Sequence, residues 1–407
     1  MCRRGSCREY VFQGEVGGDT VIQEALRARS RKLESEVPRP SKNVEALAPY
    51  DAVSSLAAIK SLPKGVVPLK LDWNESAIPP SPRVIEAITG FLSNGHHLNW
   101  YPELNAPRVR AALSNYTGVR PDSILVSNGS DDALDLVCRT YLEPGDDVIV
   151  AWPTYGHFLI YVKARGVQPR LALSEDPFAV PTSTILEMIR PETKLVYLPS
   201  PNNPTGTVTS PGDIASLCRA FPGTMFLVDE AYYEFCGVTS ASLVASFPNL
   251  VVVRTFSKCF GIAGLRVGYL MTGSVVMQNL RKLYNPKSVN ALAQIGAVAA
   301  LEDVDSREAY VAQVRASREQ FATALRRRGA EVHVTQANFI LVRVRDPQRL
   351  VMALESAGVF VRDRSRMEGF EGWVRFTVGT VSQMHDLVER IDVLLETCPG
   401  LLEPMAS

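Results

Sequence analysis

A single lysine, Lys258, lies between two apolar runs of the sequence, at residues 250–253 and 267–271. The residues around it are mostly small or carry hydroxyl groups, and one arginine, Arg266, follows. A lysine in such a tight, partly dry site has a lowered pKa, and its neutral amine forms a Schiff base with a carbonyl group. The alternative interpretation is a solvated lysine in a surface loop.

The neighbours of this lysine indicate what kind of carbonyl compound would suit it. The hydroxyl groups of Thr255 and Ser257 and the guanidinium group of Arg266 are suited to a phosphate. An aldehyde that carries a phosphate is pyridoxal phosphate. The stretch from Thr255 to Tyr269 therefore favours this cofactor over a solvated loop, as a hypothesis that its structural context has to support.

Other candidate residues follow other apolar runs. Asp229 ends the run at residues 225–228, where a carboxylate would keep a pyridine nitrogen protonated, although a turn cap is the alternative. Asn203 and Tyr232 fit as donors to a phenolic oxygen, and Tyr155 fits as a flat partner for the ring. Each of these three is also typical of a turn or of ordinary packing.

The turn Gly129-Ser130-Asp131 stands at the start of a helix that we expect to run to about Tyr141. Anions bind at such helix N-termini through oriented amide groups and the helix dipole. Asp131 and Asp132 are also favourable in a first turn, so capping is the alternative role for both. With the hydroxyl group of Ser130, this turn is a candidate phosphate site.

The elements that carry these residues alternate between strand and helix. Strands are predicted at residues 124–126, 147–151, 167–173, 195–198, 225–228 and 250–253. This alternation is typical of an α/β fold with a mostly parallel central sheet that is flanked by helices. Because ligands bind beyond the carboxyl ends of such strands, we expect the candidate residues to meet at one edge of the sheet.

The chain divides into four predicted segments. Residues 1–45 form a polar extension, either partly disordered or wrapped around a dimer partner, with a candidate helix at residues 20–34. Residues 46–75 join a smaller domain, residues 76–285 form the large domain, and residues 286–407 form a small C-terminal α/β domain.

Composition argues against several classes of function. Lysine plus arginine equals aspartate plus glutamate, 43 each, so no charge excess favours nucleic acid or a membrane surface. No apolar run approaches the ~20 residues of a membrane span, and no secretory signal is recognised. Seven scattered cysteines favour reduced thiols and a cytoplasmic location. The five histidines lack ligand spacing, so no metal site is expected.

Longer motifs are more specific than these single residues. The motifs are Asn202-Asn203-Pro204-Thr205-Gly206, Val228-Asp229-Glu230-Ala231-Tyr232 and the stretch from Ser257-Lys258 to Gly268, with support from residues 289–294 and 374–380. In these motifs the chain resembles the fold-type I, class I/II aminotransferases, and within them the histidinol-phosphate aminotransferase family. The resemblance covers roughly residues 47–394.

The resemblance implies that Lys258 carries pyridoxal phosphate and moves the substrate proton, and that Asp229 pairs with the pyridine nitrogen. The other cofactor contacts that it implies are Asn203 and Tyr232 at the phenolic oxygen, Tyr155 on the ring face, and Ser130, Asp131, Thr255, Ser257 and Arg266 around the phosphate. Tyr101 matches a tyrosine that reaches the phosphate of the other subunit, which implies a homodimer with shared active sites.

At the substrate end, Arg362 and Arg375 match the family's anion-binding pair, beside Tyr50. Guanidinium groups hold carboxylates and phosphates in bidentate fashion, and surface salt bridges are the alternative. The nearby Arg364 and Arg366 are expected in surface salt bridges.

The segment Asp72-Trp73-Asn74-Glu75-Ser76 departs from the Asn-Glu-Asn-Pro type of segment in that family. Asn74 and Glu75 are kept, Trp73 and Ser76 differ, and Asn74 is a candidate substrate contact. Because this segment helps to shape the substrate pocket, the substrate stays open.

The leading hypothesis is a biosynthetic aminotransferase for an amino acid or an amino alcohol phosphate, with a 2-oxo acid as acceptor. A decarboxylase, eliminase or cyclase with the same cofactor is the alternative, because the orientation of the substrate decides which bond breaks. A regulator without activity is a third class, but residues 1–42 are too short for the DNA-binding domain that it would need.

Overall fold

The computed structural model describes residues 23–24, 38–49, 55–95 and 98–405 of the chain. The chain separates into two units, residues 1–47 and residues 48–407. In the described part of the first unit, α2 (Lys42–Glu45) is a short helix. Of the helix predicted for residues 20–34, only Gln23 and Glu24 are described, and both are helical. The rest of that prediction lies outside the described residues.

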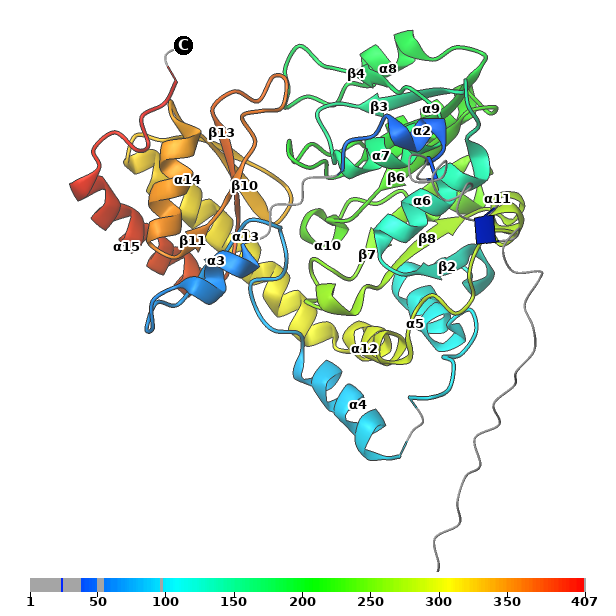
Figure 1. Ribbon diagram of the computed structural model, residues 1–407, viewed down its shortest axis with the longest axis horizontal. Coiled ribbons are helices and arrows are strands. Elements are labelled where there is room, and N and C mark those ends of the chain that lie inside the picture. Colours follow the sequence, from blue (N-terminus) through cyan, green and yellow to red (C-terminus); the bar gives the residue numbers. More distant parts are fainter. Residues whose placement is uncertain (1–22, 25–37, 50–54, 96–97, 406–407) are drawn as a thin grey trace, which may run out of the picture. The chain divides into compact units, whose positions relative to one another are not determined.

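Within the described residues, the larger unit is built on a seven-stranded sheet with the order β2-β8-β7-β6-β5-β3-β4 (Figure 1). The strands are β2 (Ile124–Ser127), β3 (Asp147–Ala151), β4 (Arg170–Ala172), β5 (Thr193–Pro199), β6 (Met225–Asp229), β7 (Leu250–Thr255) and β8 (Gly268–Thr272). The neighbouring strands β4, β3, β5, β6 and β7 pair in parallel, whereas β8 is antiparallel to both of its neighbours. The predicted mostly parallel sheet is confirmed.

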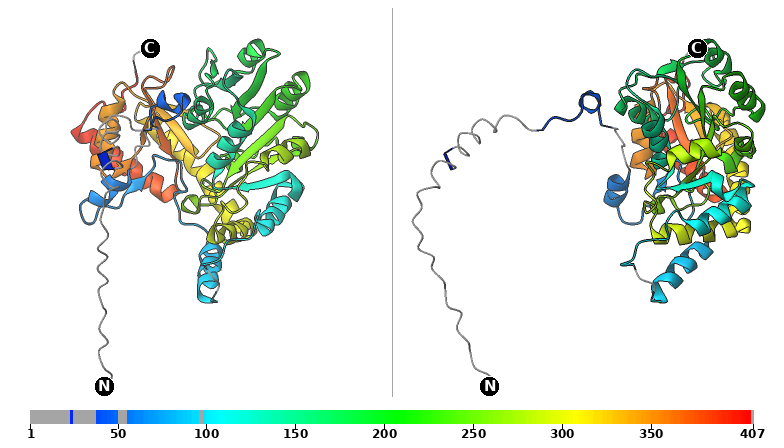
Figure 2. Two further views of the ribbon diagram at one scale, coloured as in Figure 1. Left: turned by 45° about the vertical axis from the view of Figure 1, so that its right-hand side comes forward. Right: turned by 90° about the vertical axis from the view of Figure 1, so that its right-hand side faces the viewer.

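The central strands are apolar along their whole length because both faces of the sheet are covered. Alternate side chains of a strand point to opposite faces. Val228 and Val252 therefore belong to one core, and Leu227 and Val251 belong to another. Figure 2 shows helices on both sides of the sheet. Continuous apolar runs are the pattern expected for such a doubly covered sheet.

The larger unit also contains helices. Those between residues 82 and 302 are α4 (Pro82–Ser93), α5 (Pro107–Thr117), α6 (Ser130–Tyr141), α7 (His157–Ala164), α8 (Thr182–Met188), α9 (Pro211–Ala220), α10 (Tyr233–Cys236), α11 (Ser274–Leu280) and α12 (Ala291–Glu302), with short 3₁₀ turns η1 (Pro121–Ser123), η2 (Ala241–Ala245) and η3 (Ala263–Leu265). The helices from α6 to α11 alternate with the strands as predicted.

A smaller layer follows along the chain. In the described residues it holds a four-stranded antiparallel sheet in the order β12-β13-β10-β9. The strands are β9 (Glu331–Val334), β10 (Phe339–Arg343), β12 (Arg362–Asp363) and β13 (Trp373–Thr377), and the helices are α13 (Val304–Arg327), α14 (Pro347–Ser356) and α15 (Val381–Thr397). The predicted smaller α/β layer is confirmed.

The segment that precedes the large sheet is tied to this smaller layer. It contains α3 (Leu56–Ser61) and β1 (Leu69–Lys70), and β1 pairs in parallel with β11 (Val359–Phe360). The pairing explains how residues 72–75, far from the C-terminal strands in sequence, reach the same place as β13. Asn74 donates its backbone N–H to the hydroxyl group of Thr377 at 3.0 Å.

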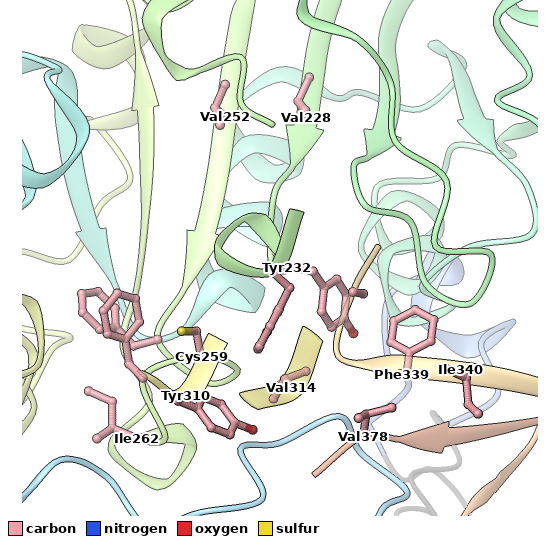
Figure 3. Packing of buried hydrophobic residues seen from close by; sticks show 14 of the residues in the cluster. Val228, Tyr232, Val252, Cys259, Ile262, Tyr310, Val314, Phe339, Ile340 and Val378 are labelled. Carbon is pink, nitrogen blue, oxygen red and sulfur yellow. The ribbon is translucent and has the colours of Figure 1, made fainter. Parts of the chain in front are cut away.

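Helix α12 packs against α4 and α5, although its residues fall in the segment predicted as the smaller domain. Small side chains allow this close packing. At Gly296, an added Cβ would lie 3.4 Å from Ile88 Cδ1 of α4 and only 2.7 Å from Leu265 Cδ1 of η3. One apolar cluster then runs from the large sheet to the smaller one. Figure 3 shows Tyr232 near Phe339, and the ring centroids of these two residues are 5.4 Å apart.

Candidate active site

The carboxyl ends of β5, β6 and β7 border a cavity of about 410 Å³. Most of the residues that the sequence singled out line it, namely Ser130, Asp131, Tyr155, Asn203, Asp229, Tyr232, Thr255, Ser257, Lys258, Arg266, Arg362 and Arg375. The expected meeting at one edge of the sheet is therefore observed. In the described part of the chain, no His, Cys, Asp and Glu side chains gather in a group that could hold a metal ion.

Lys258 follows β7, and its Nζ donates a hydrogen bond to the carbonyl oxygen of Trp73 at 2.8 Å. Burial, helped by the positive charge of Arg375, lowers the pKa of Lys258 to about 8, while Glu75 acts in the opposite direction. Desolvation disfavours the charged amine, so the neutral, nucleophilic form is more accessible than in a lysine exposed to water.

Asp229 is buried at the end of β6, and two donors fix its carboxylate. The hydroxyl group of Tyr197 donates to Oδ2 at 2.8 Å, and the backbone N–H of Ala231 donates to Oδ1 at 3.1 Å. Burial raises the pKa of Asp229 to about 6, although both hydrogen bonds oppose the rise. A dehydrated carboxylate held in this way fits a cationic ring nitrogen, whose charge would favour the ionised form.

The N-terminus of α6 is a candidate anion site. Its first amide groups have no acceptor within the helix. The guanidinium group of Arg266 reaches the same place, with Nη1 3.4 Å from Ser257 Oγ and Nη2 3.2 Å from Asp131 Oδ2. Thr255 donates to Ser257 at 3.0 Å. Amides, hydroxyl groups and a guanidinium group together are the donor set that a phosphate needs.

Two glycines make room for this anion site. At Gly268, an added Cβ would lie 2.4 Å from the backbone nitrogen of Ser130. At Gly129, where φ is +85°, an added Cβ would lie 2.6 Å from Arg266 Nη2. No other residue type leaves this space, so the backbone and the guanidinium group approach each other closely enough to form a cradle. The residues present therefore fit the phosphate of pyridoxal phosphate.

The remaining cofactor candidates are also held by neighbours. The hydroxyl group of Tyr155 donates to Asp131 Oδ1 at 2.9 Å. Asn203 Oδ1 accepts from Arg375 Nη1 at 2.6 Å, so the amide nitrogen is the donor that Asn203 offers to a ligand. The ring of Tyr232 lies 5.9 Å from Lys258 Nζ, within the range of a cation–π contact.

A second set of charges comes from the smaller layer. Arg375 is buried in β13 and also donates to the carbonyl oxygen of Asp72. Arg362 is its cross-strand partner on β12. Arg364, which was expected at the surface, is half-buried and lines the same cavity. The extended chain explains this, because residues two positions apart point to the same face, whereas Arg366 is exposed.

Two of the described candidates do not line this cavity. A third candidate, Tyr50, lies outside the described residues. Tyr101 is 79% exposed and borders a different hollow, between α4 and α12. Asn74 is buried with φ at +54°, and its Nδ2 donates to the hydroxyl group of Tyr232 at 3.0 Å. Asn74 thus supports a residue of the cavity wall, while Trp73 and Glu75 line the cavity itself.

Sequence reasoning missed the layer behind the cavity. Arg254, only 2% exposed, forms an ion pair with Glu230 at 2.8 Å and lies 3.6 Å from the ring of Tyr233. Glu230 follows Asp229 in sequence, and Arg254 lies shortly before Lys258, so the pair ties together the ends of β6 and β7. A charged residue inside an apolar strand, as Arg254 is in β7, was the available signal.

Comparison with known proteins identifies the family of this chain. The sequence profile of aminotransferase class I and II matches residues 67–391. The chain is 35% identical over 363 residues to a dihydroxyacetone phosphate transaminase of Campylobacter jejuni, covering 86% of this chain and 96% of that protein. It is 35% identical over 365 residues to a histidinol-phosphate aminotransferase of Roseiflexus castenholzii, covering 87% and 96%.

A solved structure extends the likeness to three dimensions. The histidinol-phosphate aminotransferase of Sinorhizobium meliloti in complex with pyridoxal-5'-phosphate gives a TM-score of 0.78 at 22% identity, covering 89% of this chain and 99% of that one. At this identity the likeness shows the fold, while the profile and the closer relatives show the family. The chain belongs to the class I and II aminotransferases and is a pyridoxal phosphate-dependent aminotransferase.

Proposed function

We propose that the substrate is an amino alcohol phosphate, with a 2-oxo acid as the second substrate. Histidinol phosphate and dihydroxyacetone phosphate, in the names of two relatives, are both phosphate monoesters. In both compounds, the carbon that carries the amine or the ketone is joined to the phosphate ester through one CH₂ group. This fragment defines the proposed substrate class.

The observation that carries the proposal is the cluster of arginines in the cavity. Arg362, Arg364 and Arg375 line it in addition to Arg266, which lies with the cofactor-phosphate residues. A phosphate monoester carries up to two negative charges and three acceptor oxygens, more than a carboxylate offers. Several guanidinium groups therefore match a phosphorylated substrate better than a simple amino acid.

The residues of the cavity would divide the work as follows. Bound pyridoxal phosphate supplies an electron sink for the charge left behind when the substrate loses a proton. The amine of Lys258, with its lowered pKa, accepts that proton and returns it at the next step. The ionised Asp229 holds a positive charge on the ring nitrogen. The other proposed cofactor contacts are Ser130, Asp131, Tyr155, Asn203, Tyr232, Thr255, Ser257 and Arg266.

At the substrate end, Arg375 would bind the anion and orient Asn203, and Arg362 would complete the anion site. Asn74 would act through Tyr232, whose hydroxyl group it holds. Tyr50 belongs to the same proposal on the basis of the sequence resemblance. Closure of the site around the substrate would exclude water and strengthen these charge interactions.

We also propose a homodimer in which Tyr101 reaches the cofactor phosphate of the partner. Large apolar side chains are exposed around α4, which projects from the rest of the larger unit (Figure 1). Ile85, Leu98, Trp100 and Tyr101 are 53%, 62%, 66% and 79% exposed. A patch of this kind is typical of a protein interface. Light scattering should therefore give twice the mass of the chain, and Tyr101→Ala should weaken cofactor binding.

A cytoplasmic role in amino acid biosynthesis is the last part of the proposal. Cys138, Cys218, Cys236, Cys259 and Cys398 are free thiols, which supports a reducing compartment. Within the described residues, none of the helices is both long enough and apolar enough to cross a bilayer.

The substrate class is tested with matched amines. We expect kcat/KM for an amino alcohol phosphate to exceed that for the same amino alcohol without phosphate by about 100-fold or more, because several charge-assisted hydrogen bonds are lost. Equal rates, or a preference for an aromatic or basic amino acid, would contradict the proposal. Carbon dioxide release from a phosphorylated amino acid, with the cofactor still in its aldehyde form, would favour a decarboxylase instead.

A further inference from the structure

Four acidic side chains line a cavity that otherwise gathers positive charge, and two of them, Asp131 and Asp229, are proposed cofactor contacts. Asp229 accepts from Tyr197, and Asp131 accepts from Arg266 and Tyr155. The buried Asp72 pairs with Lys70 at 3.0 Å. The fourth is Glu75, whose side chain is 32% exposed and reaches the cavity from the segment before α4. The proposed mechanism does not use its carboxylate.

The position of Glu75 is fixed by its neighbours. The ammonium group of Lys70 bridges the carboxylates of Asp72 and Glu75 and lies 5.1 Å from the ring centre of Trp73. Lys70 ends β1, and the adjacent Asn74 is bonded to Thr377 through both its backbone and its side chain. A carboxylate that is paired with Lys70 and follows an anchored residue in the chain is preorganised to recognise a ligand.

Glu75 also stands where two hollows meet. A second cavity of about 350 Å³ shares Glu75, Ala263 and Gly264 with the first. Its other walls include Lys70 and Gln383. The positive charge of Arg375 and the negative charge of Glu75 both act on the amine of Lys258, in opposite directions. Lys258, Arg375 and Glu75 also line one cavity, so a substrate in this cavity meets a cation on one wall and an anion on another.

We propose that Glu75 is a specificity-determining residue. The reacting carbon has one substituent that carries the phosphate, and Glu75 recognises the other substituent. Its carboxylate accepts a hydrogen bond from a hydroxyl or N–H group on that substituent and repels a carboxylate in the same place. The inference rests on the proposed function, which assigns the phosphate to the arginines. It predicts that the enzyme prefers phosphorylated amino alcohols to phosphorylated amino acids, because Glu75 attracts the hydroxyl group of the former and repels the carboxylate of the latter.

Two substrates that differ in one group test this directly. The monophosphate of 2-amino-1,3-propanediol carries CH₂OH where O-phosphoserine carries a carboxylate. Wild-type holoenzyme should prefer the first compound, and Glu75→Gln should shift the ratio of kcat/KM toward O-phosphoserine by about 10- to 100-fold. Glu75→Asp, which keeps the charge, should retain the preference. The exposed Glu187→Gln is the matched control.

Binding gives a second measurement that does not depend on turnover. Glycerol 3-phosphate and 3-phosphoglycerate repeat the same difference without an amine, and calorimetry with the holoenzyme measures the affinity for each. Glu75→Gln should raise the relative affinity for 3-phosphoglycerate. The kcat/KM ratio and the affinity ratio of Glu75→Gln are each compared with those of Glu187→Gln. If both agree within about twofold, the proposed role of Glu75 is wrong.

The two proposals fail in different ways. If wild-type enzyme uses neither phosphorylated amine, the proposed substrate class is wrong, and the same ratio is measured with 2-amino-1,3-propanediol and serine. A shift toward serine in Glu75→Gln would then still support the role of Glu75, and an unchanged ratio would overturn it. Circular dichroism and cofactor content confirm that each variant is folded.

Discussion

The cofactor half and the substrate half of the cavity are built in different ways. Asp229, Thr255 and Lys258 come at the ends of neighbouring strands of one sheet. The substrate half instead combines residues 72–75 with the strands β12 and β13. Arg375 donates to the carbonyl oxygen of Asp72 within this half and to Asn203 of the cofactor half.

Cofactor binding and substrate binding therefore depend on different parts of the fold. Strand order alone brings the cofactor residues together, because the carboxyl ends of parallel strands meet at one edge of the sheet. The substrate residues meet only after the N-terminal segment has paired with the C-terminal layer, through β1 and β11. We therefore expect changes in the first half to affect the cofactor, and changes in the second half to affect the choice of substrate.

The largest effect is expected at Lys258. Lys258→Ala removes both the attachment of the cofactor and the base, so turnover should fall by about 10⁴-fold or more. The visible absorbance of the bound cofactor should also disappear. The exposed Lys282→Ala is the control and should behave as wild type. A coloured and active Lys258→Ala protein would break the assignment of the cofactor half.

A smaller but still large effect is expected from the ion pair behind the cofactor half. Arg254→Met leaves Glu230 buried without its cation, which should cost about 3–5 kcal/mol of unfolding free energy in urea titrations. The double variant Arg254→Met/Glu230→Gln should recover part of this loss. Breaking the exposed pair of Arg345 and Glu403 with Arg345→Met should cost less than about 1 kcal/mol. Similar losses from the two single variants would contradict the account of the buried pair.

The smallest expected effect concerns Tyr197. Its hydroxyl group stabilises the ionised form of Asp229, so Tyr197→Phe should raise the pKa of that carboxyl above its value of about 6, by roughly half to one unit. Cofactor affinity falls as the pH drops through this pKa, because the neutral acid no longer favours a cationic ring. The midpoint should therefore move to higher pH in Tyr197→Phe and stay in place in Tyr284→Phe. Identical midpoints in all three proteins would remove Tyr197 from the site.

The pKa of Lys258 gives a further test on the cofactor half. Only the neutral amine attacks an aldehyde, and its fraction rises with pH until the pKa is passed. With a pKa of about 8, the rate at which cofactor-free protein takes up pyridoxal phosphate should rise from pH 6 and level off above about pH 9. A rate that keeps rising toward pH 10, near the ordinary pKa of a lysine, would show that the site does not lower this pKa.

The sequence predicted the cofactor half well for a physical reason. Lys258, Asp229 and Ser257 each follow an apolar strand, and strand ends in a parallel sheet converge. Tyr197 was missed because its neighbours in β5 make it look like an ordinary core residue. Its role depends on the adjacent strand β6, which brings Asp229 within 2.8 Å.

The substrate half was harder to predict because it depends on contacts between distant segments. Arg364 looked like a surface charge until the extended chain around β12 put it on the same face as Arg362. The support that Asn74 gives to Tyr232 also depends on the fold, since the two residues are 158 positions apart. Tyr101 stays a prediction, because its proposed partner is a second copy of the chain.

One paired measurement tests the division into two halves most directly. Arg266→Ala and Arg375→Ala remove one guanidinium group from each half, and each variant is measured for its apparent Kd for pyridoxal phosphate and its KM for an amino alcohol phosphate. We predict that Arg266→Ala raises the cofactor Kd by about 10-fold or more, and that Arg375→Ala raises KM by about 10- to 100-fold with the cofactor Kd changed less than about threefold. Equal losses of cofactor and substrate affinity in Arg375→Ala would contradict the division and make that arginine a structural residue of the whole cavity.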